Sequence, residues 1–146
     1  MSDHLPRSAR LPPEGFAPIP RTSRFRELVG PVYFRRDDSG VTCGLYVDER
    51  HENLGGLMHG GMIATLADIA LGNGIAWTND PPLSLVTISL TVDYAGTAAP
   101  GDWVEARVDV QRVGRNVAFS SCYIWCGGQR IARASGTFAV KSRDRD

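Results

Sequence analysis

The chain has 146 residues, of which 42% are hydrophobic, enough for one core and too few for two comfortable domains. Its 16 basic and 16 acidic residues cancel, so the electrostatic signature of a protein that binds nucleic acid or a membrane surface is missing. A transmembrane run of about 18 apolar residues and a signal-peptide pattern are also missing, which favours a cytoplasmic location. We therefore expect a single domain at residues 22–146, preceded by a proline-rich arm at residues 1–21.

Short elements are predicted in the first third of the chain. Residues 22–29, TSRFRELV, join a Ser/Thr cap to good helix formers and stop at a Gly-Pro pair, a pattern typical of a short helix. Residues 32–36 are predicted to form a strand. In residues 41–48 apolar and polar side chains alternate, which predicts a second strand, joined to the first by an Asp-Ser-Gly turn.

The longest helical pattern covers residues 62–77 within NLGGLMHGGMIATLADIALGNGIAWTN, residues 53–79. Its apolar residues fall on every face of a helix, which predicts a helix buried all round. The one formal charge in this segment is Asp68. An ionised carboxylate in such a helix costs several kcal/mol unless partners or water meet it, so Asp68 is expected to be either well paired or kept for chemistry.

The start of this helix has the sequence His59-Gly60-Gly61. The first amide donors of a helix have no partner inside it, and glycines allow a ligand to come close to them. Together with the positive end of the helix dipole, these donors suit an incoming negative oxygen. The sequence therefore predicts an oxyanion cradle about two helical turns from Asp68.

Four more strands follow the helix, predicted at residues 86–94, 104–111, 117–126 and 129–141. In the last of them the alternate residues Ala132, Ala134 and Gly136 are small, as a strand requires where a helix crosses close to its backbone. The compact arrangement of these elements is an α+β fold in which one antiparallel sheet wraps around one long helix.

The side chains that commonly bind metals do not form a recognisable site. Cys43, Cys122 and Cys126 make an odd count without a C-x-x-C pair, so we expect reduced thiols that serve packing. The three histidines and the scattered carboxylates show no ligand spacing. We therefore expect no metal and no cofactor.

Four blocks occur in order between residues 28 and 140: Asn53-x5-His59-Gly60-Gly61-x6-Asp68, VTISLTVDYAGTAAPGD at 86–102, VGR at 113–115 and IARASGTFAV at 131–140. Together they resemble the PaaI-like hotdog-fold acyl-CoA thioesterases of the 4-hydroxybenzoyl-CoA thioesterase superfamily. The resemblance implies a hotdog fold and a homodimer or homotetramer whose protomers pair their sheets. It also implies an acyl-CoA substrate, hydrolysed to the free acid and CoA.

The resemblance also implies roles for individual residues. Asp68 is expected to act as general base on water or as nucleophile, and the N–H of Gly61 as the main oxyanion donor. His59 is expected to shape the loop and contact the thioester, Asn53 to position the lytic water or the carboxylate, and Thr87 to orient the carboxylate. Asn53, His59 and Gly61 are expected from one subunit, with Asp68 and Thr87 from the other.

Thioester hydrolysis fits these residues on chemical grounds as well. The reaction needs an activated water, donors aimed at the developing oxyanion and a leaving thiolate of low basicity, which CoA supplies. Arg112, Arg115 and Gly60 are the candidate contacts for CoA, although arginines beside a turn are commonly solvated.

Each of these residues also has a structural interpretation. Asp68 can cap a neighbouring loop, His59 can anchor its own loop, and Asn53 can hydrogen-bond its own backbone in a turn. In strict alternation Thr87 lies on the face opposite that of Val86, which would turn it away from the site. Only its position near the start of the strand allows it to reach the site.

Two functions from different classes follow from the sequence. The first is an acyl-CoA thioesterase, and the alternative is a non-catalytic hotdog protein that binds acyl-CoA. A hotdog hydratase or dehydratase is a weaker alternative, because its usual His and Glu arrangement is not found in the chain. Asp68 favours the thioesterase, since a pure binder has little reason to keep a costly carboxylate. The pocket for the acyl group is expected among Trp77, Leu83, Leu85 and the arm.

Overall fold

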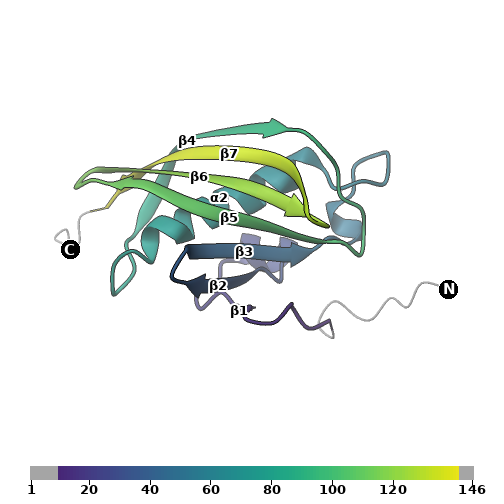
Figure 1. The fold of residues 1–146 in the computed structure, drawn as a ribbon, viewed down its shortest axis with the longest axis horizontal. Coiled ribbons are helices and arrows are strands. Elements are labelled where there is room, and N and C mark those ends of the chain that lie inside the picture. The colour runs from purple at the N-terminus through teal and green to yellow at the C-terminus, as the bar shows by residue number, and fades with distance from the viewer. Residues whose placement is uncertain (1–9, 142–146) are drawn as a thin grey trace.

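The computed structural model describes residues 10–141, so the first nine residues of the predicted arm lie outside the described range. Figure 1 shows one long helix and one sheet. The elements are β1 (Ala17–Pro18), α1 (Arg24–Val29), β2 (Tyr33–Asp37), β3 (Gly40–Tyr46), the 3-10 helix η1 (Glu49–His51), α2 (Gly60–Ala76), β4 (Leu85–Tyr94), β5 (Trp103–Val113), β6 (Val117–Cys126) and β7 (Gln129–Val140). In the described part of the chain, every helix is too short or too polar to cross a membrane.

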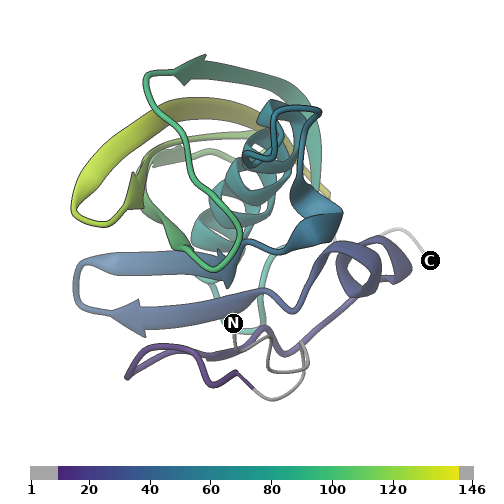
Figure 2. The same ribbon diagram turned by 90° about the vertical axis from the view of Figure 1, so that its right-hand side faces the viewer.

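The strands form one seven-stranded antiparallel sheet in the order β1-β2-β3-β5-β6-β7-β4. After α2 the chain enters the sheet at the far edge as β4, beside β7, and β5 then pairs with β3. Figure 2 views α2 nearly end-on, with the sheet curled around it. The predicted α+β arrangement, a sheet wrapped around one helix, is therefore confirmed.

Small residues on β7 let α2 lie close to the sheet. Ala132 and Ala134 are buried beneath it, and a Cβ placed on Gly136 would lie 3.2 Å from Leu71 Cδ1. The buried Ser120 hydroxyl of β6 donates to the Leu71 carbonyl, 3.3 Å away, and so satisfies a polar group inside the contact. The prediction that a helix crosses close to the backbone of the last strand is therefore confirmed.

The prediction that α2 is buried on every face is wrong for the single chain. Half of its residues are buried against the sheet. The positions Gly61, Ala64, Thr65, Asp68, Ile69, Gly72, Asn73 and Ala76 are exposed or half-buried. They recur every three or four residues and so form one continuous stripe, which we call the open stripe. Most of its side chains are small or apolar, and for that reason the sequence pattern did not distinguish this face from the buried one.

Strand β4 does not keep one apolar face along its length. The register against β7 shifts between Thr87 and Ser89, where Ile88 is the extra residue of a β-bulge. As a result Leu90 packs against the core, while the side chain of Val86 is 47% exposed and that of Ile88 58%. The prediction of a single apolar face along residues 86–94 is therefore wrong, because the bulge interrupts the alternation. The bulge also places Thr87 opposite the buried Phe138 of β7.

The described part of the arm follows the edge of the sheet. Strand β1 pairs with Tyr33 and Phe34 of β2, and the Phe16 ring meets the Trp103 ring edge-on at a centroid distance of 5.0 Å. Ile19 packs against the hydrophobic core. Residues 10–21 therefore add a wall beside β2.

The cysteines are free thiols, as expected from the sequence. Cys43 and Cys122 are buried, and burial raises the pKa of each thiol to about 12. A thiol with so high a pKa remains protonated at neutral pH and packs as a small apolar group.

The closeness of α2 to β5 can be tested at Gly74. A Cβ on Gly74 would lie 2.4 Å from Cγ1 of Val108, a stiff branched side chain. We expect Gly74→Ala to lower the free energy of unfolding by about 1–3 kcal/mol through overpacking. In a Val108→Ala background the same substitution should be neutral or stabilising by up to about 1 kcal/mol, because the clash is gone and alanine favours a helix. Urea unfolding at one protomer concentration measures both, and an equal effect in the two backgrounds would contradict this packing.

Candidate functional site

A cavity of about 380 Å³ lies beside the open stripe. Asp68, Ile69, Gly72, Asn73 and Ala76 line it from α2, Leu85 and Thr87 from β4, Phe138 from β7, and Ile19, Arg21 and Arg26 from the arm and α1. Trp77 and Leu83, which the sequence placed around a pocket with Leu85 and the arm, also line it. The cavity is thus built from segments that are far apart in sequence.

Asp68 and Thr87 meet in the wall of this cavity. The Thr87 hydroxyl donates to Oδ1 of Asp68 at 2.7 Å. The contact depends on the bulge in β4, because the register shift at Ile88 brings Thr87 to the same side of the strand as Leu90. Asp68 is half-buried, so its carboxylate is held in place and still has access to the cavity and to water.

The first turn of α2 is closed by its own cap. His59 is the N-cap residue, and its Nδ1 accepts the Gly61 N–H at 2.8 Å. Both residues are exposed. The Gly60 carbonyl accepts the Tyr94 hydroxyl at 2.6 Å, and a Cβ on Gly60 would lie only 3.4 Å from the Tyr94 ring. The Gly61 N–H is thus engaged by His59 in the single chain, and the oxyanion cradle stays a prediction.

Asn53 holds the loop before α2. Its side-chain Oδ1 accepts the N–H groups of Gly55 at 2.9 Å and Leu57 at 3.1 Å, and its own N–H donates to the Leu57 carbonyl at 2.7 Å. This is the turn geometry that the sequence left open as the structural interpretation of Asn53. A role of Asn53 toward a lytic water stays a prediction.

Three residues that the sequence reasoning missed support the same loop. The Tyr94 hydroxyl donates to the Gly60 carbonyl. Tyr94 lies four residues after the helix-facing Leu90 and so on the same face of β4, and this alternation was the signal in the sequence. The buried His51 accepts the Asp48 N–H at Nδ1, 3.0 Å away, and its Nε2 is 2.7 Å from the Val29 carbonyl of α1. Its backbone carbonyl accepts the His59 N–H at 2.7 Å. Arg50 donates to Leu28 and Gly30, which closes the C-terminal end of α1.

The structure aligns Gly61 and Asp68 on the open stripe but does not bring them together. They are seven residues apart on one helix, which separates them by about 10 Å along its axis. Arg112 and Arg115 are both exposed, at the end of β5 and in the following turn, and neither lines the Asp68 cavity. Arg112 lies opposite Phe119, on the outer face of the sheet.

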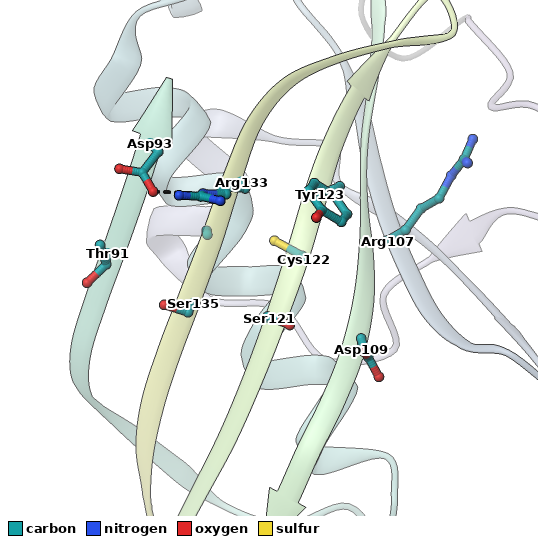
Figure 3. A pocket seen from close by; sticks show the side chains of 10 residues that line it. Thr91, Asp93, Arg107, Asp109, Ser121, Cys122, Tyr123, Arg133 and Ser135 are labelled. Carbon is teal, nitrogen blue, oxygen red and sulfur yellow. Dashed lines mark hydrogen bonds and ion pairs between the residues drawn. The ribbon is translucent and has the colours of Figure 1, made fainter. Parts of the chain in front are cut away.

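A second hollow of about 330 Å³ lies on that outer face, away from α2 (Figure 3). Its charges are largely paired: Arg133 Nε contacts Asp93 at 3.0 Å, and Arg107 Nε contacts Glu105 at 3.4 Å. The Asp68 cavity, which combines apolar walls with a positioned carboxylate, is therefore the stronger candidate for a functional site.

Comparison with known proteins places this geometry in a family. Residues 55–132 match the family described as the thioesterase superfamily. A Pseudomonas aeruginosa protein named "Putative esterase" is 41% identical over 127 residues, which cover 86% of this chain and 95% of that protein. The human protein acyl-coenzyme A thioesterase 13 is 30% identical over 102 residues, which cover 69% of this chain and 72% of its own.

The fold is also shared with solved structures. A mutant of the phenylacetic acid degradation protein PaaI from Thermus thermophilus superposes with a TM-score of 0.70. The match covers 80% of this chain and 98% of that one at 24% identity. The implied hotdog fold is thereby confirmed.

The support that Tyr94 gives to the start of α2 can be measured. We expect Tyr94→Phe to lower the free energy of unfolding by about 0.5–1.5 kcal/mol, because the substitution keeps the ring over Gly60 and removes one hydrogen bond. Hydrogen exchange should also accelerate at the amides of residues 60–63. Tyr123→Phe on the outer face is the matched control, and equal effects of the two substitutions would contradict the assignment.

Proposed function

The chain belongs to the thioesterase superfamily, and from this premise we propose that it hydrolyses an acyl-CoA thioester to the free acid and CoA. The observation that carries the proposal is the Asp68 carboxylate, held by Thr87 in the wall of a cavity that polar and apolar side chains line together. The name of the human relative, an acyl-coenzyme A thioesterase, supports CoA as the leaving group.

Asp68 supplies the base. It takes a proton from a water that attacks the thioester carbonyl, or its carboxylate attacks the carbonyl directly and water then hydrolyses the mixed anhydride. In either case the carbon–sulfur bond breaks, CoA leaves as the thiolate, and an oxygen from water ends in the free acid. The Thr87 hydrogen bond fixes the direction of the carboxylate during attack.

Gly61 supplies the oxyanion donor. Its N–H now points at His59 Nδ1, 2.8 Å away, at the positive end of the α2 dipole. When the thioester oxygen arrives, it replaces the ring nitrogen as acceptor, so the exchange costs little hydrogen-bond energy. Both residues are exposed, which leaves room for His59 to turn aside and contact the substrate.

The separation of Gly61 and Asp68 supports a site shared by two chains. Within one chain the two groups are too far apart to act on one carbonyl, since both must come within about 3 Å of the reacting atoms. Two α2 helices packed antiparallel on a two-fold axis would bring Gly61 of each chain to Asp68 of the other. The midpoint between these positions falls at Ala64 and Thr65, whose small side chains permit close approach.

The free edge of the sheet supports the same assembly. Within the described residues β4 pairs with β7 on one side only, and Val86 and Ile88 near its start are exposed. An open edge with apolar side chains is a surface that a folded protein normally covers. A homodimer, alone or doubled to a tetramer, would cover both this edge and the open stripe.

One observation favours the alternative of a non-catalytic acyl-CoA-binding protein. The Gly61 N–H is already satisfied by His59, so the oxyanion donor is not free in the single chain. Turnover therefore has to be measured directly.

We expect Asp68→Asn to lower kcat about 100-fold or more while acyl-CoA binding changes by only a few fold, because the change keeps the shape and removes the base. Release of CoA thiol from a panel of acyl-CoA thioesters measures the rate, and calorimetry measures binding. Asp93→Asn, an equal change on the outer face, is the control and should leave the rate intact. Near wild-type hydrolysis by the Asp68→Asn protein would exclude the mechanism.

The shared site has its own test. Gly61→Val crowds the oxyanion donor and Asp68→Asn removes the base, so each homodimer carries two damaged sites. In a mixed dimer one site collects both lesions, and the other combines an intact Gly61 with an intact Asp68. Differently tagged chains, isolated as the heterodimer, should therefore recover about half of the wild-type activity in a closed two-fold assembly. A heterodimer no more active than its parents would show that each site lies within one chain.

A further inference from the structure

Two arginines share the cavity of Asp68. Arg21, at the end of the arm, and Arg26, on α1, line the wall built by the N-terminal segment, while Asp68 and Thr87 line the wall built by α2 and β4. Two guanidinium groups against one carboxylate give the cavity a net positive charge. A cavity that served only an uncharged acyl chain would have no use for this excess.

Arg26 is the more constrained of the two. It is half-buried, and this partial burial lowers the pKa of its guanidinium. Its Nη2 donates to the backbone carbonyl of Arg21. Its other donors have no carboxylate partner among residues 10–141. A half-buried guanidinium gains most from an anion that meets its fork of donors.

Several other arginines in the described range contact an acid or an aromatic ring. Arg35 contacts Asp37 at 3.4 Å, Arg50 contacts Asp48 at 2.8 Å, and Arg133 contacts Asp93 at 3.0 Å. Arg36 lies over the Trp77 ring, 4.8 Å from its centroid. Arg26 combines a place in the lining of the Asp68 cavity with the absence of an acid partner among the described residues.

The cavity runs along α2, and the rest of its lining is apolar except for Asn73 and Ser84. From Asp68 to Ala76 the helix axis extends about 12 Å. Ile69, Leu83 and Phe138 supply apolar walls, and the missing side chain of Gly72 keeps the floor open. A thioester carbonyl at Asp68 would thus be followed by an apolar stretch for the acyl chain.

We propose, on the basis of the thioesterase function above, that the acyl group ends in a carboxylate bound by Arg26, with Arg21 adding a second positive charge. The substrate class is then the CoA half-thioesters of dicarboxylic acids. Asp68 reinforces this orientation, because its negative charge repels a carboxylate at the reacting end, while the arginines on the wall built by the N-terminal segment attract it. A CoA phosphate offers the same anionic chemistry to Arg26, so the test must separate the two sources.

Glutaryl-CoA and valeryl-CoA form the matched pair, because they have equal numbers of carbons and differ in the terminal carboxylate. We expect a kcat/KM about tenfold or more higher for glutaryl-CoA, and Arg26→Gln should remove this preference by lowering the glutaryl value while valeryl stays within about threefold. Arg26→Lys, which keeps the charge, should retain part of the preference. Arg24→Gln, on the same helix and outside the cavity lining, should leave it unchanged.

The pantetheine thioesters of the same two acids lack the nucleotide phosphates. They therefore show whether Arg26 binds the terminal carboxylate of the acyl group or a phosphate of CoA. The preference and its loss in Arg26→Gln should persist with them. If Arg26→Gln weakens both CoA thioesters equally and neither pantetheine thioester, Arg26 binds a CoA phosphate and the inference is overturned. Hydrolysis of valeryl-CoA without a preference for glutaryl-CoA overturns the inference alone. Absence of all hydrolysis contradicts the proposed function instead, and calorimetric binding of the two CoA thioesters then still tests Arg26.

Discussion

The close contact between α2 and the sheet is the constraint on which the other features depend. It is possible because Gly74 faces Val108 and Gly136 faces Leu71, where side chains would hold the two layers apart. A helix packed so tightly on one side must turn its remaining face away from the sheet, and that face is the open stripe. Asp68 lies on the stripe, so the carboxylate avoids the low-dielectric core and its desolvation cost. The packing of the helix and the accessibility of the candidate base thus have one cause.

Most of the fold was predictable because alternation and turn residues report on strands directly. The strand predicted at residues 117–126 coincides with β6. The small residues of β7 correctly predicted that the long helix crosses close to this strand. The bulge at Ile88 was not predictable, since inserting one residue into a ladder leaves the local composition unchanged. That single irregularity decides whether Thr87 reaches Asp68. The side chain that strict alternation turned away from the site is the one that the register shift brings into it.

The candidate site was predictable only in part, and for a different physical reason. Sequence spacing located Asp68 and the glycines at the start of α2, because helix ends and lone charges leave local signals. It could not show that His59 caps Gly61, that Asn53 closes its own turn, or that His51 ties α1 to the loop before α2. The contacts of His59 and Asn53 are local and were open as structural interpretations, whereas the contact of His51 with Val29 joins segments whose separation in sequence carries no pattern. Arg26 belongs to the same category, since only folding brings α1 beside Asp68.

In the proposed dimer, the open stripe would link catalysis to assembly through helix geometry. A rise of about 1.5 Å per residue keeps Gly61 and Asp68 of one chain apart, whatever their side chains do. The same periodicity places both on one face, so a two-fold axis between two such helices would bring Gly61 of each chain to Asp68 of the other. Small residues at the midpoint would reduce the steric cost of that approach, and the same assembly would pair the free edge of β4. Selection for a working site and selection for a covered surface would then act on the same residues. If the proposed shared site is correct, an isolated protomer that keeps its fold lacks a complete site.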